Sequence, residues 1–515
     1  MYANHQDQQI LPGNFFLPFG GRLSENNRWV QLSYLIPWRR VEQEYSKHFS
    51  KHFSKHFSKH FSKHFSKHFS KDVRGGRAVS VRMALGALII QEREGFSDRH
   101  LVQHITGNPY LQYFIGLPAY QEEPPFDPSL LTHFRKRLGP DVINQVNEWI
   151  VQAGLKDEQN GDDDQNNNEP PRESGQSEVN SQSKAEVQEP QTHQGKLILD
   201  ATCTPADIAY PTDLSLLNRA REKLEDIIDT LHAPHKGEVK KPRDRRRQAR
   251  RDYLRTAKNR KPSRAEIRKA VGRQLRYVAR NLKFIEQLVH CTPLMALSRR
   301  QYRDLLVIGE LYRQQREMYQ SRSHRVDDRI VSIAQPDVRP IVRGKAKANV
   351  EFGAKVSISV VEGYTLMERT SWDSFNEGST LIESVERYVE RFGYYPETIL
   401  ADKIYRTREN LQYCKDHGIR MSGPKLGRPP RQVDREQKKM EQQDMGERNA
   451  VEGKFGEGKR IYGLGLMRTR LRQTSETVIA IQLLIMNLEK RLRLLFLLIL
   501  GELFGTDFGT TVVIA

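Results

Sequence analysis

Thr398–Arg406 has the sequence TILADKIYR, and its pattern decides the fold of the second half of the chain. The apolar residues stop at Asp402, which predicts a short buried strand that ends in a carboxylate. Asp200 has a comparable place after the apolar residues 197–199, and Glu452 lies in a helix-like segment. In open α/β sheets, ligands collect at the carboxyl ends of the strands. We therefore expect these three acids to converge at that edge of a sheet.

The segments around this stretch alternate between strand-like and helix-like patterns. Strands are predicted at 196–202, in a hairpin at 352–369 that turns at Glu362-Gly363, and at 419–421. Helices are predicted at 213–231, 376–392, 407–417, 432–462 and 475–500, and an amphipathic helix is expected to continue from the basic region through Tyr319. This order describes an α/β domain with a mixed sheet. A long helical insertion, about 213–335, separates its first strand from the hairpin.

The chain is strongly basic. Its 515 residues are enough for two or three domains, and its formal net charge is +19. Between Lys236 and Lys283 there are 20 Lys or Arg and four acidic residues, so this stretch alone contributes +16. A basic stretch is often only a solvated helix face, but an excess of this size favours contact with the phosphate backbone of nucleic acid. The arginines expected to make this contact are Arg245, Arg246, Arg247, Arg250 and Arg251.

The segment 72–155 is predicted to be helical. Residues 78–91 are strongly apolar, Gly95 interrupts them, and Ser97 is a suitable N-cap for a helix at 98–105. Two helices joined by such a short turn fit a DNA-binding helix-turn-helix and fit equally well a small helical bundle. The sequence leaves both alternatives open.

Two segments are expected to lie outside the folded domains. The motif SKHF occurs six times in tandem from Ser46 to Phe69. Histidines four residues apart on a helix could bind a transition metal, but perfect repetition favours an expanded and passive repeat. Residues 156–195 have almost no apolar side chains, so burial cannot offset their ordering entropy. A disordered acidic and polar linker is expected there.

Several classes of protein are disfavoured. The longest apolar run is LLFLLIL at 494–500, far below the roughly 20 residues that span a bilayer. The N-terminus lacks the pattern of a secretory signal, so we expect no membrane partner. The three cysteines are widely spaced, which excludes a disulfide framework and a CxxC zinc site and suits a reducing cytoplasm.

These patterns divide the chain into six parts. We expect an N-terminal segment at 1–45, the SKHF repeat at 46–71, a helical DNA-binding domain at 72–155, the linker at 156–195, a catalytic domain at 196–475 and a C-terminal helix and tail at 476–515.

The three acids suggest a chemistry. Phosphodiester exchange needs an activated oxygen nucleophile and a stabilised leaving oxygen, and two hard cations about 3.5–4 Å apart supply both. A few Asp or Glu residues can hold Mg²⁺, which keeps several of its waters. Considered singly, Asp200 and Asp402 could each be a capping residue and Glu452 a solvated helix residue. Their joint occurrence on a basic chain favours the metal site.

From Asp200 to Lys459 the chain resembles a DDE transposase of a bacterial insertion sequence. Four stretches carry the resemblance: LILDATCTPADIAYPTDL, VRGKAKANVEFGAKVSIS, YYPETILADKIYRTREN and RNAVEGKFGEGKR. In that family the third acid lies in the signature Y-x2-R-x3-E-x6-K. Arg448, Glu452 and Lys459 keep its spacing, whereas Met445 stands at the position of the tyrosine. Residues 77–138 also resemble the helical domain that often precedes the catalytic domain.

The arrangement of the insertion departs from a common pattern of the family. These enzymes often have a β-rich segment between the second and third acids. Here only 50 positions separate Asp402 from Glu452, and the insertion lies between the first and second acids.

The resemblance implies an RNase H-like catalytic domain preceded by an all-α N-terminal domain. It implies that Asp200, Asp402 and Glu452 are catalytic and bind two Mg²⁺ ions, for which Mn²⁺ can substitute. Arg448 and Lys459 share a helix face with Glu452 and are expected to hold phosphates near the scissile bond, with Lys403 as a further DNA contact. The implied partners are double-stranded DNA, as terminal inverted repeats and as target, and a second copy in a homodimer. The implied location is the bacterial cytoplasm, at the nucleoid.

Three alternatives remain open at this point. The first is a related metal-dependent nuclease that hydrolyses DNA without joining it. The second is a regulatory or architectural DNA-binding protein whose acids are structural. The third is a decayed transposase, in which the SKHF repeat disturbs DNA recognition by the N-terminal part.

Overall fold

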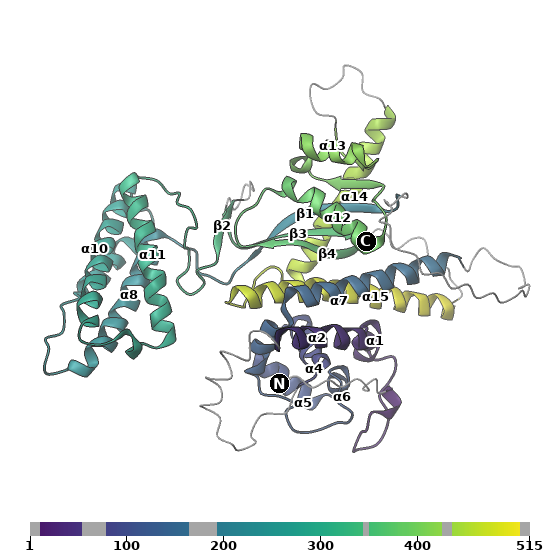
Figure 1. Cartoon of the computed structure of the whole chain (residues 1–515), viewed down its shortest axis with the longest axis horizontal. Coiled ribbons are helices and arrows are strands. Elements are labelled where there is room, and N and C mark those ends of the chain that lie inside the picture. Colours follow the sequence, from purple (N-terminus) through teal and green to yellow (C-terminus); the bar gives the residue numbers. More distant parts are fainter. Residues whose placement is uncertain (1–10, 54–78, 164–192, 343–349, 425–434, 505–515) are drawn as a thin grey trace, which may run out of the picture.

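The computed structural model describes residues 11–53, 79–163, 193–342, 350–424 and 435–504 (Figure 1). Most of the SKHF repeat and most of the predicted linker lie outside the described residues, so these two predictions are not tested there. In the described residues, no helix is both long and apolar enough to cross a membrane.

The N-terminal part is a bundle of helices. Ser80 and Ser97 cap two of them by accepting hydrogen bonds from the backbone N–H groups of Met83 and His100, as residues of this type do at helix starts. Gly95 ends the first of the two in the left-handed region, at φ 69°. The bundle consists of α1 (Arg28–Leu35), α2 (Trp38–Phe53), α4 (Val81–Glu94), α5 (Asp98–Gly107), α6 (Pro109–Phe114) and α7 (Leu130–Asp163), with a 3₁₀ turn η1 at Pro12–Asn14.

The bundle begins earlier in the chain than the expected boundary at residue 72. Trp29 and Trp38 pack edge to face on Phe114, with ring centroids 5.1 and 5.7 Å apart. The expected N-terminal segment 1–45 therefore contributes core residues to the same bundle as α4 and α7.

The second half of the chain contains a six-stranded mixed sheet. Its path is β2-β3-β1-β5-β6, and β4 pairs with β3 beside β2. Strands β1, β5 and β6 are parallel, and β3 runs antiparallel to β1 and to β4. The strands are β1 (Lys196–Pro205), β2 (Arg339–Val342), β3 (Val350–Val361), β4 (Tyr364–Ser371), β5 (Thr398–Ala401) and β6 (Arg420–Met421).

The predicted hairpin is confirmed. Glu362 and Gly363 join β3 to β4 at φ 45° and 75°, the positive values that a two-residue hairpin turn of primed type requires.

Helices cover both faces of the sheet, because alternate residues of each strand face opposite sides. Ile198, Val356 and Ile358 contribute to the core shared with the N-terminal bundle, whereas Leu197 and Leu199 belong to a separate core. The helices on the face of the second core are α12 (Leu381–Phe392) and α13 (Arg408–Asp416). The helices on the other face are α7, α14 (Arg435–Arg460) and α15 (Arg472–Phe504).

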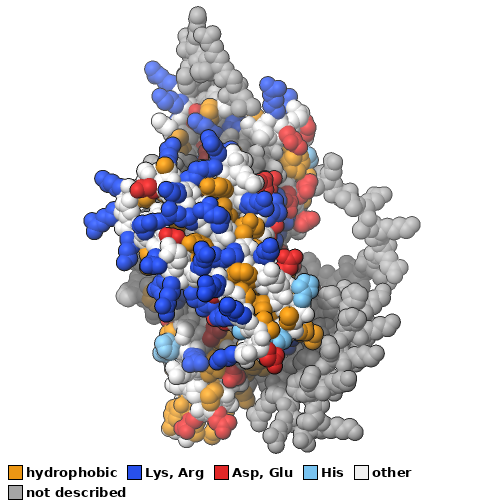
Figure 2. Space-filling view, turned by 90° about the vertical axis from the view of Figure 1, so that its left-hand side faces the viewer, with side chains coloured by type: hydrophobic (Ala, Val, Ile, Leu, Met, Phe, Trp, Pro, Cys, Tyr) orange, Lys and Arg blue, Asp and Glu red, His pale blue; other side chains and the backbone are white. Residues whose placement is uncertain are grey.

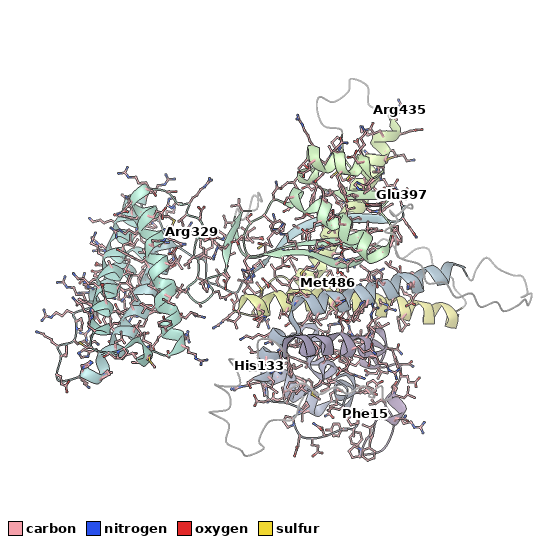
Figure 3. The ribbon with its side chains drawn as sticks, in the orientation of Figure 1. Phe15, His133, Arg329, Glu397, Arg435 and Met486 are labelled. Atoms are coloured by element: carbon pink, nitrogen blue, oxygen red, sulfur yellow. The ribbon has the colours of Figure 1, made fainter. Side chains whose placement is uncertain are left out.

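Helices α7 and α15 lie side by side between the sheet and the other helices of the bundle (Figure 1). Met486 of α15 lies in this layer (Figure 3). Buried Asn487 of α15 accepts a hydrogen bond from the backbone N–H of Thr365 in β4 (2.8 Å) and donates to the side-chain oxygen of Asn147 in α7 (2.8 Å). One amide side chain thus ties three elements together.

Helix α7 differs from the sequence prediction, because it continues to Asp163 and the expected linker was placed from residue 156. Glu158 in this last part accepts hydrogen bonds from Tyr364 (2.7 Å) and from Lys490 of α15 (3.1 Å). These long-range contacts stabilise a polar helix end that has no apolar pattern of its own.

The predicted helical insertion is a separate group of helices between β1 and β2 (Figure 1). Its core is distinct from the cores of the sheet and is built from residues such as Leu217, Leu224, Val278 and Ile308. The group consists of α8 (Asp213–His232), α9 (Arg246–Ala257), α10 (Arg264–Val289) and α11 (Arg299–Ser321), with 3₁₀ turns η2 (Ala233–His235) and η3 (Leu294–Ala296). We call residues 213–335 the helical unit.

The expectation of one continuous helix through Tyr319 is wrong. The chain breaks between α10 and α11, where Pro293 cannot donate a helical hydrogen bond. Ser298 then starts α11 by accepting from the N–H of Gln301. Arg329, near the end of the unit (Figure 3), pairs at 2.7 Å with Asp213, the first residue of α8. This ion pair joins the two ends of the unit.

Candidate active site

Asp200 and Asp402 lie at neighbouring positions of two parallel strands, where β5 ends as predicted and β1 continues to Pro205. Leu199 of β1 pairs with Ala401 of β5 in the parallel register, and each aspartate is the next residue along its chain. Neighbouring strands are about 4.8 Å apart, so the two aspartates occupy adjacent positions. Asp402 is exposed and caps a 3₁₀ turn, η5 (Lys403–Tyr405), by accepting from the N–H of Lys403 at 2.7 Å.

Helix α14 runs alongside β1 in the same direction. At the start of the strand, Lys196 pairs with Glu447 at 2.7 Å. At its end, the N–H of Met467, which follows α14 in the chain, donates to the carbonyl of Pro205 at 2.8 Å. Val451 is fully buried in the core to which Ile198 also contributes. The helix that carries Glu452 is therefore fixed against the face of β1 that contains Ile198. Asp200 lies on the same face, because it follows Ile198 by two residues.

A second contact fixes the same helix to β6, the strand beyond β5 at the edge of the sheet. Arg420 of β6 forms a bidentate pair with Asp444 of α14, with both N–O distances 2.8 Å. Such a fork restricts the rotation of the helix as well as its distance from the sheet.

Glu452 itself points largely to solvent. Its side chain is 63% exposed, and one oxygen lies 4.0 Å from a guanidinium nitrogen of Arg448. Within the described residues, no three His, Cys, Asp or Glu side chains lie close enough to hold a metal ion together. The structure thus brings Asp200 and Asp402 together and places the helix of Glu452 beside them. It does not gather the three carboxylates into one cluster.

The carboxyl group of Asp200 is electrostatically unusual. Burial raises its pKa to about 6, against the hydrogen bond from the N–H of Ala201, which lowers it. The negative charges of Glu377 and Asp402 raise the pKa further, and the positive charge of Arg448 lowers it. A nearby cation would stabilise the charged form of a carboxyl group in such surroundings.

Glu377 is an acidic residue that the sequence did not indicate and whose charge raises the pKa of Asp200. It begins a 3₁₀ turn, η4 (Glu377–Thr380), just before α12 and pairs with Lys355 of β3 at 2.9 Å. In the sequence it is one glutamate in a polar loop, DSFNEGS, with no apolar strand before it. Its approach to Asp200 depends on the tertiary fold, so no local pattern could have indicated it.

The basic residues predicted around the acids differ in exposure. Lys403 is exposed beside Asp402, whereas Arg448 and Lys459 are partly buried along α14. The side chain of Arg448 is 23% exposed and contributes positive charge at Asp200.

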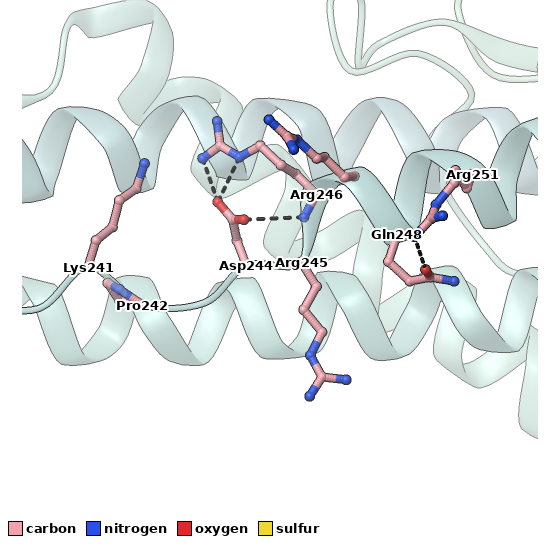
Figure 4. Close-up of a pocket in the computed structure, with 8 residues that line it drawn as sticks. Lys241, Pro242, Asp244, Arg245, Arg246, Gln248 and Arg251 are labelled. Atoms are coloured by element: carbon pink, nitrogen blue, oxygen red, sulfur yellow. Dashed lines mark hydrogen bonds and ion pairs between the residues drawn. The ribbon is translucent and has the colours of Figure 1, made fainter.

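The helical unit presents a strongly basic surface. Figure 2 shows Lys and Arg side chains spread over the face of this unit that is turned to the viewer. Beside the start of α9 there is an open hollow of about 460 Å³ (Figure 4). It is lined by Lys241, Pro242, Asp244, Arg245, Arg246, Arg247, Gln248 and Arg251.

The predicted arginines of this surface have different surroundings. Arg246 forms a bidentate pair with Asp229 (2.8 and 3.0 Å) and also bonds to Asp244, and these two carboxylates hold its pKa above the ordinary value. Arg247 and Arg250 are exposed, and Arg251 bonds to Gln248 at 2.7 Å (Figure 4).

Arg245 has a left-handed backbone at φ 52°, which L-residues with long side chains adopt at a cost. It is exposed at the start of α9. Arg246 therefore stabilises the fold of the unit, whereas its exposed neighbours are available to a ligand.

Comparisons with known proteins agree with this geometry. A family model described as "Transposase DDE domain" matches residues 399–489, which include Asp402 and Glu452. A second model, "Transposase domain (DUF772)", matches residues 18–137 in the N-terminal bundle. A protein of Rhizobium meliloti, "Uncharacterized protein ORF8 in nfe locus", is 24% identical over 195 residues, which cover 38% of this chain and 70% of that protein. No solved structure matches significantly.

The two transposase models match separate parts of the chain. One covers the N-terminal helices and the other covers the strand of Asp402 and the helix of Glu452, which the parallel strands and α14 bring beside Asp200. Both matches support the identification of the chain as a DDE transposase of an insertion sequence.

Proposed function

We propose that this transposase binds the ends of its insertion sequence, cuts the DNA there and joins the freed 3′ ends to target DNA. The observation that carries the proposal is the adjacency of Asp200 and Asp402 on two parallel strands, beside the helix that holds Glu452. A metal-dependent phosphodiester exchange needs carboxylates from rigid elements in such an arrangement.

We further propose that the domain of the sheet is RNase H-like. The order β4-β3-β1-β5-β6, with β3 reversed and helices α12 and α13 between the later strands, supports this assignment. The expected domain boundaries remain part of the proposal, with the N-terminal bundle extended to include α1 and α2.

The residues present fit a divalent cation. The available donors are carboxylate oxygens, which Mg²⁺ and Mn²⁺ prefer. The pKa of Asp200 is raised first by burial and then by the negative charges of Glu377 and Asp402, and a bound cation would favour the charged carboxylate. Asp200 and Asp402 would hold the ions, and Glu452 would join them after its side chain turns from Arg448 toward the sheet. When bound, two such ions supply activation of the attacking oxygen and stabilisation of the leaving oxygen.

The basic residues of α14 and η5 would hold the DNA in place. Lys403 follows Asp402 directly and is exposed to an incoming strand. Arg448 lies near Asp200, and Lys459 lies about two turns beyond Glu452 on the same helix face. In this proposal their side chains bind phosphates on either side of the scissile bond and orient it toward the carboxylates.

We propose that the helical unit binds the phosphate backbone away from the cut. Arg247 and Arg250 are exposed on this unit, and neither forms an ion pair with a carboxylate of the described residues. The double variant Arg247→Gln/Arg250→Gln should weaken binding to all duplexes and reduce the slope of log K against log salt by about 1 for each lost contact. Arg246→Gln, on the same helix, is the variant for comparison. It should lower the stability of the unit, because it removes the pairs with Asp229 and Asp244. A salt slope unchanged in the double variant would place the contact elsewhere.

The test of the catalytic proposal is a cleavage assay with a duplex that carries the DNA flanking the reading frame. In Mg²⁺, Asp200→Asn, Asp402→Asn and Glu452→Gln should each lower the cleavage rate at least about 100-fold and keep DNA binding. Asp416→Asn, at an exposed position of α13, is the control. If all three variants cut as fast as the unaltered chain, the proposal is wrong.

Two further assays separate the alternatives. Pre-nicked ends test for joining, since a nuclease without strand transfer would release them unjoined. Absence of any metal-dependent activity would favour the regulatory or decayed protein. Analytical ultracentrifugation with the end duplex tests the proposed homodimer.

A further inference from the structure

The segment between α14 and α15 carries three arginines in the sequence MRTRLR, and we call these residues, 467–472, the arginine segment. Its start is fixed to the chain that leaves β1. The backbone N–H of Met467 donates to the carbonyl of Pro205 (2.8 Å), and the carbonyl of Met467 accepts from the N–H of Asp207 (3.1 Å). The arginine segment therefore begins at a fixed position beyond the end of β1.

The other end of the arginine segment is fixed to α15 and, through α15, to the N-terminal bundle. The hydroxyl of Thr469 lies 2.8 Å from the hydroxyl of Ser475 in the first turn of α15. Half a turn later, the buried hydroxyl of Thr477 donates to the carbonyl of Arg135 in α7 at 2.9 Å. The segment thus joins the end of β1 to the bundle with a backbone that is held at both ends.

The exposure of the side chains alternates along the arginine segment. Met467 is buried and Thr469 is half-buried, whereas Arg468 and Arg470 are exposed. Such alternation is typical of an extended chain, in which every second residue lies on the same side, about 6.5 Å from the last. Arg472 pairs with Glu476 at 3.0 Å, but no carboxylate of the described residues lies within ion-pair distance of Arg468 or Arg470. Two neighbouring positive charges are therefore presented to solvent without a partner carboxylate.

The basic surface continues on the bundle. Gln473, which directly follows the arginine segment, donates to the carbonyl of Lys136 in α7 at 3.4 Å. Lys136 and Arg137 are both exposed. They lie one turn after His133, which Figure 3 shows on the side of the bundle that is turned toward the helical unit. Exposed cations thus follow one another from the end of β1 to the N-terminal bundle.

The distance from the carboxylates to the arginine segment follows from β1. Five residues separate Asp200 from Pro205, to which the segment is bonded. At about 3.3 Å per residue of a strand, this separation is about 16 Å. Duplex DNA rises about 3.4 Å per base pair, so the same length corresponds to about five base pairs.

We propose that the arginine segment binds the phosphate backbone of the duplex that carries the end of the insertion sequence, about five base pairs from the cut. The inference rests on the proposed function and deepens it by assigning a DNA-binding surface between the N-terminal bundle and the carboxylates. Arg468 and Arg470 bind phosphate oxygens, for which the planar guanidinium group is well suited. Lys136 and Arg137 extend the contact to the bundle. Contacts of this kind position the duplex and carry no sequence information.

A solvated loop is the alternative, since exposed charged side chains often contact only water and contribute little. The two interpretations differ in how local the effect of the charge is. If the arginines are only solvated, their loss should affect DNA binding no more than an equal loss of charge elsewhere on the surface. If they bind particular phosphates, their loss should have no effect once those phosphates are neutral.

The first experiment is a titration of the full chain with the end duplex at several salt concentrations, followed by fluorescence anisotropy. Arg468→Gln/Arg470→Gln should weaken binding at least about fivefold and reduce the slope of log K against log salt by about 1–2, because each phosphate contact contributes about 0.9. Lys438→Gln/Lys439→Gln is the matched control. It removes the same charge from two exposed lysines near the start of α14, at the end of that helix away from the arginine segment, and should change the slope by less than about 0.5.

The second experiment locates the contact on the DNA. In a second end duplex, uncharged methylphosphonates replace the phosphates about three to seven base pairs from the cut. The unaltered chain should bind this duplex more weakly than the ordinary one. Arg468→Gln/Arg470→Gln should bind it within about twofold of the unaltered chain, because the arginines and these phosphates belong to the same contact.

The outcomes separate this inference from the proposed function. If the slope changes no more in Arg468→Gln/Arg470→Gln than in the lysine control, or if the fivefold difference persists on the methylphosphonate duplex, the role of the arginine segment is wrong and the proposed function stands. If the unaltered chain neither binds nor cuts the end duplex, both proposals are wrong. If the double variant does not fold, Arg470→Gln alone is judged by the same criteria, with an expected slope change of about 1.

Discussion

Replacing Asp200 with Asn should stabilise the metal-free protein above pH 6. In the folded state burial raises the pKa of Asp200 to about 6, and the charges of Glu377 and Asp402 add to the increase. The unfolded chain has the ordinary value of about 3.9. The folded state therefore binds the proton more tightly than the unfolded state does. The stability that Asp200 contributes is fully present below about pH 4 and is lost as the pH rises through 6.

The magnitude follows from the size of the shift. About two pKa units correspond to about 3 kcal/mol at pH values above 6, at 1.36 kcal/mol per unit. Partial exposure and rearrangement of the neighbours reduce this figure, so we expect a gain of about 1–3 kcal/mol for Asp200→Asn at pH 8. Asparagine keeps the shape of the side chain and the hydrogen bond from the N–H of Ala201, which makes the charge the main difference.

The assay is urea unfolding of both proteins in EDTA at pH values from 4 to 8. The difference in unfolding free energy should be small at pH 4, increase between pH 4 and 6, and level off above 6. All other titrating groups are common to both proteins and cancel in the difference. Asp416→Asn, at the exposed surface of α13, should give no comparable gain at pH 8.

Two results would refute the reasoning. One is a free-energy difference between Asp200→Asn and the unaltered chain that does not vary with pH. The other is a loss of stability in Asp200→Asn at pH 8.

Addition of Mg²⁺ provides a further experiment, since a ligand that binds only the folded state stabilises it by mass action. If Asp200 binds the cation, Mg²⁺ should raise the stability of the unaltered chain and have little effect on the variant.

Two other predictions concern the elements that support the site. Asn487→Ala should lower the free energy of unfolding by about 1–3 kcal/mol, because the buried N–H of Thr365 loses its acceptor, and denaturant unfolding measures the loss. An unchanged midpoint would mean that water replaces the amide. Gly353→Ala should cost about 1–3 kcal/mol or prevent folding, since its Cβ would lie 2.0 Å from the carbonyl oxygen of Thr204 in β1. A variant with normal stability and secondary structure would contradict the close approach of the two strands.

The strand ends of the site could be predicted because their signals are local. The apolar run before Asp402 stops where β5 stops, and the Glu362-Gly363 pair has the composition that a tight hairpin turn needs. The helix start at Ser97 likewise depends on a side chain that bonds to a backbone group three residues away. Such features are visible without knowledge of the tertiary structure.

The features that could not be predicted depend on contacts between distant parts of the chain. The end of α7 has a linker-like composition and is helical because Glu158 binds Tyr364 and Lys490, more than 200 residues away. Glu377 carries no local signal, and its effect on the pKa of Asp200 depends on the packing of η4 on η5. The same holds for Arg246, whose pair with Asp229, 17 residues earlier in the chain, distinguishes it from its exposed neighbours.

The position of the insertion in the chain relates the carboxylate site to the arginine-rich helical unit. Strand β1 passes through Asp200 and ends at Pro205, and the helical unit starts a few residues later. The chain returns through β2, which pairs with the first residues of β3 at the same end of β1. The core of the unit is separate from those of the sheet, and a long insertion adds little to the cost of closing the loop, so the unit could be added without disturbing β1. It is attached after the end of β1, five residues beyond Asp200, and we therefore expect DNA that is held by its arginines to pass close to the carboxylates.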